Sequence, residues 1–240
     1  MLNDQILAAF MESFYGYGNY QARFWFIGME EGGGETIADI SKRLKAWDER
    51  GRNELEDVAG FHKDIGINHL FNKHPELQPT WKQLIRIVLT ATEQGNDTES
   101  IRTYQEKLLG RTDGDTCMLE LFPLPSPNTS TWLYGDNSSI SYLTDRKTYR
   151  KRLANLRIAD LKKRIAVYKP RVVVFYGKTY QKYWKGIAGI ETWEKPSANI
   201  EYGMNDETFF IITLHAADRR TSNEYFNQVG RLILKEAFKF

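Results

Sequence analysis

Two carboxylates, Glu30 and Glu31, stand in a glycine-rich loop directly after an apolar segment of the chain. The loop reads, in order, Gly28, Met29, Glu30, Glu31, Gly32, Gly33, Gly34 and Glu35. Consecutive glycines let backbone amides approach a ligand closely, but a phosphate cradle fits poorly, because no lysine and hydroxyl follow and the carboxylates would repel an anion. The pattern instead suits a positive centre or the activation of a water. The alternative is that both carboxylates only stabilise the start of the next helix.

A histidine and two arginines follow a later apolar segment. His215 comes directly after residues 208–214, and Arg219 and Arg220 lie in the next turn. A lone histidine there is either a packing residue or a catalyst, and its place after a strand, like that of Glu30, favours catalysis. The two arginines suit phosphate groups at the start of a helix, or they form a solvated turn.

Glu120 is the one charge inside the apolar segment Thr116–Phe122. An ionised carboxylate is almost never buried without a partner, so Glu120 has a basic neighbour or lines a pocket. Its position near the end of the segment favours the pocket. The proline-rich turn that follows, at 123–127, is stiff because each proline ring fixes the backbone angle φ.

Strand-like and helix-like segments alternate along the chain, which predicts an α/β architecture with a mostly parallel, four-stranded sheet. The expected strands are 22–28, 116–122, 171–176 and 208–214. The expected helices are 4–14, 35–47, 80–93, 98–109, 145–168, 179–185 and 222–240. Ligands bind beyond the carboxyl ends of strands in open α/β sheets, so Glu30 and His215 are expected to face each other across one cleft there.

The 240 residues are expected to form a single domain, 1–240, with an insertion or lid at about 48–79. The histidines of that stretch, His62, His69 and His74, have an irregular spacing, so we expect them at the surface and expect no metal. One cysteine excludes an internal disulfide, and the apolar runs are too short for a membrane helix. Without a basic leader, the cytoplasm is the expected location. A net charge of +2 means that nucleic-acid binding would depend on local patches.

Together these segments resemble the uracil-DNA glycosylase superfamily. Gly28, Gly32 and Glu35 match the first motif, which is written G-E-A-P-G-x-x-E in the thermostable branch. Glu30 falls where related branches carry the residue that handles water.

Later segments are also similar to the family's. Residues 118–125 look like its second strand and proline loop, 169–179 like its K-P-x-V-I-V-x-L-G strand, and His215 occupies the place of the histidine in H-P-S. The four segments span residues 22 to 220 in the family's order. The resemblance implies a three-layer α/β/α fold and a DNA glycosylase, which hydrolyses the N-glycosidic bond of a damaged or modified base without a cofactor.

The resemblance also implies roles for individual residues. Glu30 would stabilise a cationic sugar or orient the water, and His215 would donate a hydrogen bond to the base oxygen that gains charge. The implied base pocket comprises Gly28, Glu31, Gly32, Gly33, Gly34, Glu120 and Phe122. The implied DNA-phosphate ligands are Arg219, Arg220, Lys147, Arg150 and Lys151.

The chain departs from the family's pattern at several points. Glu31 replaces the motif proline, Ala216 and Ala217 replace the proline and serine of H-P-S, and Glu120 stands where the family has a base-reading asparagine. The usual stacking aromatic is missing, and Trp47 is a later candidate. These changes keep open a non-catalytic protein that binds nucleic acid or a nucleotide, and a hydrolase of small molecules.

Glu120 also sets the expected choice of base. An ionised carboxylate only accepts hydrogen bonds, so it suits an exocyclic amine and not the keto edge of uracil. We therefore expect inefficient uracil release unless burial raises the pKa of Glu120 enough to keep it protonated.

Overall fold

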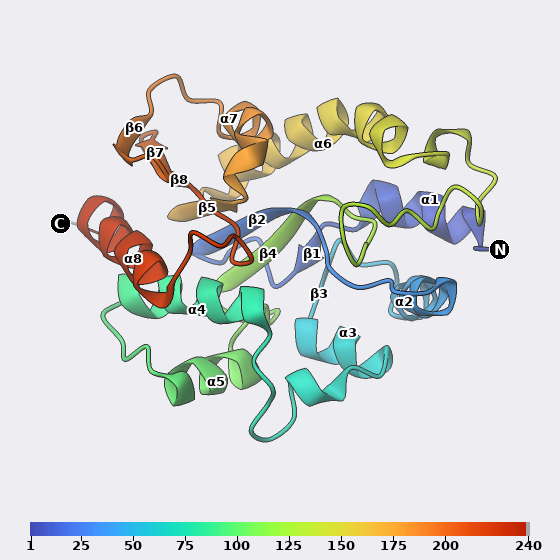
Figure 1. The fold of residues 1–240 in the computed structure, drawn as a ribbon, viewed down its shortest axis with the longest axis horizontal. Helices are drawn as coiled ribbons and strands as arrows, with labels where there is room; N and C mark the ends of the chain where they lie inside the picture. Colours follow the sequence, from blue (N-terminus) through green and yellow to red (C-terminus); the bar gives the residue numbers. More distant parts are fainter. Residues whose placement is uncertain (239–240) are drawn as a thin grey trace.

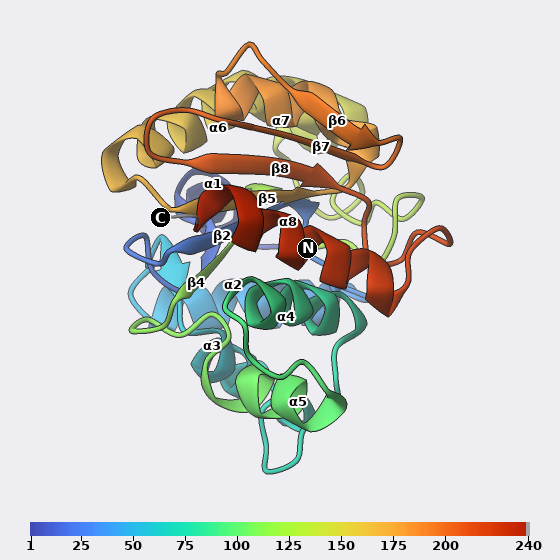
Figure 2. The same ribbon diagram turned by 90° about the vertical axis from the view of Figure 1, so that its left-hand side faces the viewer.

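The structure is a computed structural model that describes residues 1–238. Within them one mixed sheet has eight strands in the order β3-β1-β4-β2-β5-β8-β7-β6. The strands are β1 (Gly16–Tyr17), β2 (Phe24–Glu30), β3 (Leu55–Glu56), β4 (Thr116–Phe122), β5 (Val172–Tyr176), β6 (Glu194–Ser197), β7 (Ile200–Met204) and β8 (Phe209–Thr213). Helices lie on both sides of the sheet, as Figures 1 and 2 show.

The α-helices are α1 (Asp4–Ser13), α2 (Ile37–Glu49), α3 (Val58–Asp64), α4 (Pro79–Ala91), α5 (Thr98–Lys107), α6 (Arg146–Tyr168), α7 (Gln181–Ala188) and α8 (Asn223–Ala237). Three short 3-10 turns are η1 (Asn68–Leu70), η2 (Ser141–Leu143) and η3 (Lys178–Tyr180). In Figure 2, α6 and α7 lie on one side of the central strands, and α4 and α8 lie on the other. The last two expected helical residues, 239 and 240, lie outside the described residues.

The expected four-stranded sheet is too small. The four expected strands are present as β2, β4, β5 and β8, and their neighbours in the sheet pair in parallel. Short strands extend the sheet on both sides: β1 and β7 pair antiparallel with β4 and β8. Three of these strands are hard to recognise in the sequence, because β1 and β3 have two residues each and every residue of β6 is exposed.

The four central strands consist almost entirely of buried apolar side chains. Both faces of a parallel sheet are covered, so its strands carry apolar residues continuously and not in alternation. The single exception in the apolar run of β4 is Glu120, which is only partly buried. The apolar runs therefore determine the sheet, and the exception marks a place where the sheet faces something other than core.

Local capping fixes the two helices that border the carboxyl edge of the sheet. Thr36 and Asp39 form a capping box at the start of α2, immediately after the glycine-rich loop. Asp145 caps α6 by accepting a hydrogen bond from the backbone of Thr148. The first two turns of α6 are thereby placed beside the end of β2.

The order of the parallel strands creates a topological switch point. From β2 the chain goes to β4 on one side and then to β5 on the other side of β2. In open α/β sheets, ligands bind outside the carboxyl ends of strands at such a point. The ends of β2 and β5, at Glu30 and Tyr176, are therefore where a ligand site is expected from the topology.

Residues 48–79, expected as an irregular insertion or lid, contain β3, α3 and η1. His62 on α3 is 3% exposed, so its expected surface position is wrong, whereas His69 and His74 are exposed. Apolar neighbours explain the burial, since His62 packs against Phe61, Phe71 and Trp81. No helix within residues 1–238 is both long and apolar enough to span a membrane.

Candidate active site

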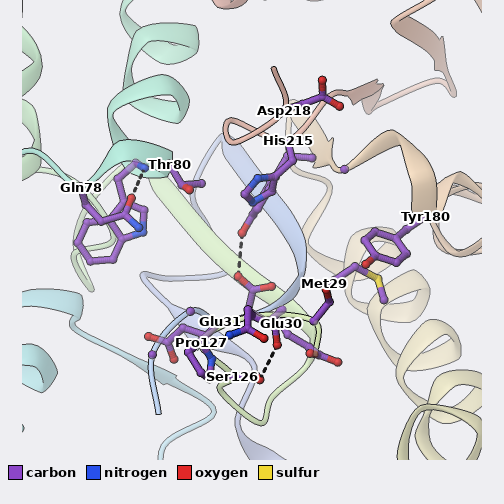
Figure 3. A pocket seen from close by; sticks show the side chains of 18 of the residues that line it. Met29, Glu30, Glu31, Gln78, Thr80, Ser126, Pro127, Tyr180, His215 and Asp218 are labelled. Atoms are coloured by element: carbon purple, nitrogen blue, oxygen red, sulfur yellow. Dashed lines mark hydrogen bonds between the residues drawn. The ribbon is translucent and has the colours of Figure 1, made fainter. Parts of the chain in front are cut away.

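A cavity of about 560 Å³ opens at the carboxyl ends of the four parallel strands. Glu30 of β2, Glu120 of β4, Tyr176 of β5 and His215 after β8 all line it. In Figure 3, His215 lies on one side of the cavity, and Glu30 and Glu31 lie on the other. The structure thus brings together Glu30, Glu120 and His215, which lie far apart in the sequence.

Glu120 and Tyr176, from the strands on either side of β2, form the floor of the cavity, and Gly28 lies beneath their contact. Glu120 pairs with Gly28, and Tyr176 follows the residue that pairs with Ile27, so Gly28 lies between Glu120 and Tyr176. The Tyr176 hydroxyl donates a 2.8 Å hydrogen bond to Glu120 Oε1 across the glycine. A Cβ on Gly28 would come within 2.3 Å of the Tyr176 hydroxyl and 2.5 Å of Glu120 Oε2. Only glycine therefore allows this contact.

The floor carboxyl is neutral at pH 7. Burial raises the pKa of Glu120 to about 8, the carboxylates of Glu30 and Glu31 add to the increase, and the Tyr176 hydrogen bond opposes it. Its Oε2 is enclosed and has no hydrogen-bond partner within the described chain. A protonated carboxyl offers a donor as well as acceptors, as an asparagine amide does. The premise for expecting poor uracil release, an ionised Glu120, is therefore absent at neutral pH.

His215 lies at the rim as a neutral ring. Its Nδ1 accepts a 3.1 Å hydrogen bond from the Ala217 backbone amide, which places the ring proton on Nε2. Much of the side chain faces solvent, yet the protein around the cavity mouth lowers its pKa, against the opposing charge of Asp218. A neutral imidazole with a free Nε2–H can donate to a ligand oxygen without releasing a proton.

Glu30 is held by two arginines of α6. Its side chain is 8% exposed, and Oε1 accepts a 2.7 Å hydrogen bond from Arg150 Nε. Arg146 Nε lies 3.7 Å from Oε2. Arg150, expected as a DNA-phosphate ligand, thus lines the cavity and pairs with the expected catalytic carboxylate. Oε2 accepts no hydrogen bond from any described residue and is the oxygen open to a water.

Glu31 belongs to a separate network on the other side of the loop. Its Oε1 accepts hydrogen bonds from the Tyr17 hydroxyl at 2.8 Å and from Arg43 Nη1 at 3.0 Å. His62 Nε2 lies 3.9 Å from the same oxygen, and burial lowers the pKa of His62. Neighbouring residues of an extended chain point in opposite directions, so Glu30 and Glu31 face different partners. Both carboxylates keep an Oε2 that accepts no hydrogen bond from the described residues, and they differ in their partners: Glu30 pairs with the arginines of α6, and Glu31 with Tyr17 and Arg43.

The segment that was expected to be a lid forms a wall of the cavity. Ile67 and Leu70 of that segment, together with Trp81 at the start of α4, line it with half-buried apolar surface. None of the three was expected from the sequence, in which Trp47 was the candidate for stacking. Trp47 is fully buried and packs edge-on against Phe10, away from the cavity. The only available signal was that Trp81 lies near the start of an amphipathic helix.

The structure leaves several expected site residues outside the cavity. Gly32 and Gly33 line it, but Gly28, Gly34 and Phe122 do not. Phe122 is fully buried between Tyr149 and Tyr183. The expected phosphate ligands Lys147, Lys151 and Arg219 are exposed and do not line it, and Arg220 pairs with Asp218 at the rim. Residues 1–238 contain no group of three or more side chains suited to hold a metal ion.

Neither protein-family models nor curated protein sequences match this chain. The likeness to uracil-DNA glycosylases therefore rests on the residues themselves. Of these, Glu30, Glu120 and His215 line one cavity, and Gly28 lies beneath the contact between Glu120 and Tyr176.

Proposed function

We propose that this protein is a DNA glycosylase-like hydrolase, which takes one extruded base into the cavity and hydrolyses its N-glycosidic bond. The observation that carries the proposal is that Glu30, Glu120 and His215 line one cavity at the switch point of the sheet. An enzyme that acts on a base must take it out of the stack, and the cavity, of about 560 Å³, is within the usual size of ligand pockets.

The neutral groups of the cavity suit the polar edge of a base. Protonated Glu120 can donate to a keto oxygen once its enclosed Oε2 turns toward the cavity, and His215 Nε2–H can donate to a second oxygen. Trp81 and Tyr180 add aromatic surface to the walls. At neutral pH this arrangement fits a base with keto groups, such as uracil or hypoxanthine. An ionised Glu120, which only accepts hydrogen bonds, would instead favour an amine-bearing edge.

Glu30 is the residue proposed to handle water. In hydrolysis the bond between the sugar C1′ and the base nitrogen breaks, and its electron pair goes to the base. The water oxygen bonds to C1′, and the water proton passes to Glu30 Oε2 and then to the departed base. His215 would stabilise the negative charge that builds on the base oxygen.

A binding protein without catalysis is the second candidate, and one observation favours it. Arg146 and Arg150 place two positive charges at Glu30, next to where a sugar cation would form. Their field opposes that cation, although it favours an anionic leaving base or a nearby phosphate. A protein that recognises an extruded base or a nucleotide needs the cavity but not the cleavage.

Base release from oligonucleotides separates the two candidates. Single- and double-stranded probes with one uracil, hypoxanthine, xanthine, or modified cytosine or adenine are incubated with the protein, and abasic sites are measured. We expect release of a keto base at pH 7. Glu30→Gln should slow release by about a hundredfold or more, in the range of a lost general base. Glu35→Gln, an exposed change in the same loop, is the matched control.

The outcomes are distinct. Release that is unchanged in Glu30→Gln would contradict the mechanism. No release from any probe, together with measurable binding of a free base or nucleoside, would establish the binding protein instead. Neither release nor base binding would remove both candidates.

A further inference from the structure

Three lysines surround one buried carboxylate beside the cavity. Glu201 on β7 is 4% exposed, and its oxygens lie 3.0 Å from Lys178 Nζ, 2.7 Å from Lys185 Nζ and 3.9 Å from Lys195 Nζ. The lysines come from η3, α7 and β6, and Figure 2 shows α7 and β6 as neighbours at its top. We call Lys178, Lys185 and Lys195 the lysine cluster.

The lysine cluster has more positive charge than Glu201 needs. Hydrogen bonds from Lys185 and Lys178 lower the pKa of Glu201 despite its burial, so the carboxylate is ionised at pH 7. Three ammonium groups and one carboxylate leave a net charge of +2. Three ammoniums present about nine N–H donors, and one carboxylate has room for about four. One lysine would suffice to neutralise Glu201, so its burial does not explain the other two.

The excess charge is concentrated on one face of the sheet. Glu194, the other acidic residue of the β6–β7 hairpin, pairs with Tyr202 and accepts a hydrogen bond from its hydroxyl. Tyr202 follows Glu201 in the strand, so Glu194 lies on the opposite face. Lys195 follows Glu194 and therefore lies on the face of Glu201. No acid of the two strands other than Glu201 offsets the lysine cluster on that face.

We propose that the lysine cluster binds the phosphate backbone of the nucleic-acid strand whose base enters the cavity. Lys178 belongs to the lysine cluster and also lines the cavity, so the two are continuous. Lysines are point charges suited to successive phosphates, and Glu201 positions them. The proposal names the backbone contact of the proposed function and rests on it.

Two of the three arginines first expected to hold phosphates, Arg150 and Arg220, are less available, whereas Arg219 is exposed. Arg150 pairs with Glu30, and Arg220 pairs with Asp218. Each of these two guanidinium groups is engaged by an adjacent carboxylate, although Glu30 is shared between Arg150 and Arg146. The lysine cluster carries the surplus charge that those residues lack.

The test is the salt dependence of DNA binding. A fluorescein-labelled oligothymidylate and a labelled duplex are titrated with the full chain, and anisotropy gives the dissociation constant from about 50 to 200 mM salt. Neutralising three phosphate contacts should lower the slope of log affinity against log salt by about 2 for the single strand. The variant Lys178→Gln/Lys185→Gln/Lys195→Gln with Glu201→Gln tests this without leaving a buried carboxylate unpaired.

The matched control changes the same number of lysines elsewhere. Lys45, Lys63 and Lys107 are exposed on α2, α3 and α5, and none lines the cavity. Their triple change to glutamine should leave the slope as in the native protein. Equal slopes for the native protein and the cluster variant would overturn the proposal, as would equal losses in both variants.

A folding defect and failure of the proposed function are recognised separately. The single variant Lys195→Gln removes only the most exposed lysine and should lower the single-strand slope by about 0.7. If base release or free-base binding persists while the cluster variant keeps the native slope, the backbone site is wrong and the proposed function stands. If the slope falls but no base is bound or released, the backbone site stands and the proposed function fails.

Discussion

Glu120, which is partly buried, and Glu201, which is buried, are carboxyl side chains on two strands of the same sheet, and they hold opposite charge states. Two ammonium groups lie within 3.0 Å of Glu201 and lower its pKa. Glu120 has one hydrogen-bond partner, the neutral Tyr176 hydroxyl, and burial raises its pKa to about 8. The charge of the partner, and not burial alone, therefore decides whether a carboxyl in this sheet is ionised.

The backbone explains why no cation reaches Glu120. Arg157 lies behind the end of β4, but its guanidinium donates to the carbonyls of Phe14, Glu120 and Leu121. It stabilises the strand end, and no hydrogen bond joins it to the Glu120 carboxyl. The floor of the cavity therefore offers neutral hydrogen-bonding groups, and the neighbouring lysine cluster carries positive charge. A base edge and a phosphate need these two environments.

The largest expected effect is the pH dependence of stability that Glu120 causes. The folded protein holds this proton up to about pH 8, whereas the ordinary carboxyl value is 4.5. Between these values the folded state binds more protons, so the free energy of unfolding falls as pH rises, by at most about 1.4 kcal/mol per pH unit. Urea denaturation of the native protein and of Glu120→Gln at several pH values between about 5 and 8 measures it.

The comparison with Glu201 gives this experiment its control. The pKa of Glu201 is lowered, so its contribution is present above about pH 4.5 and is lost as pH falls below that value. Glu201→Gln should therefore alter only the acidic limb, and Glu120→Gln should flatten the curve above it. Parallel curves for the native protein and Glu120→Gln would show that Glu120 is ionised.

The second effect concerns the glycine that allows the neutral floor. Gly28→Ala places a Cβ within 2.3 Å of the Tyr176 hydroxyl and 2.5 Å of Glu120 Oε2, so one of them must move. We expect a loss of about 2 kcal/mol in unfolding free energy, as for other overpacked sites. Gly32→Ala, with no atom within 4 Å of its new Cβ, is the control and should change stability by less than about 0.5 kcal/mol. Similar losses in both would rule out the crowding argument.

The third effect tests whether Glu201 needs its nearest lysines. The double variant Lys178→Gln/Lys185→Gln should lose about 1–2 kcal/mol of unfolding free energy, because an ionised carboxylate loses its two closest partners. The aliphatic parts of the lysine side chains shield much of Glu201 from solvent, so water can reach the carboxylate in the double variant. The loss of unfolding free energy therefore stays below that for a deeply buried ion pair. Adding Glu201→Gln should recover most of it. A loss that persists in the triple variant would point to packing instead.

The sequence predicts the centre of the fold because that part obeys simple rules. Apolar runs on both faces define β2, β4, β5 and β8, and the carboxyl ends of parallel strands lie at one edge. Hence Glu30, Glu120 and His215 could be assigned to one cleft from the sequence alone. Glu120, the charged residue in the apolar run of β4, was a valid signal of a pocket. The pKa of its carboxyl depends on neighbours in the fold that the sequence does not identify.

What could not be predicted depends on contacts between distant segments. Glu30 and Arg150 are 120 positions apart, and nothing local distinguishes Arg150 from the other cations of α6. Tyr176 reaches Glu120 only through the strand register that places Gly28 between them. The polar stretch 48–79 lacked periodicity, so His62 was expected at the surface, and the walls built from Ile67 and Leu70 were missed.

The smallest expected effect separates stability from binding within the lysine cluster. Lys195 Nζ lies 3.9 Å from Glu201, and its side chain is 63% exposed, so Lys195→Gln should change the free energy of unfolding by less than about 0.5 kcal/mol. The same substitution should lower the salt slope of single-strand binding by about 0.7, because an exposed ammonium contributes fully to counterion release. A lysine that only supports Glu201 would show the reverse, with a measurable loss of stability and an unchanged slope. Denaturation and anisotropy on one preparation distinguish a phosphate-binding Lys195 from a structural one. A phosphate-binding lysine needs solvent access, whereas a lysine that stabilises the fold needs a short ion pair shielded from water.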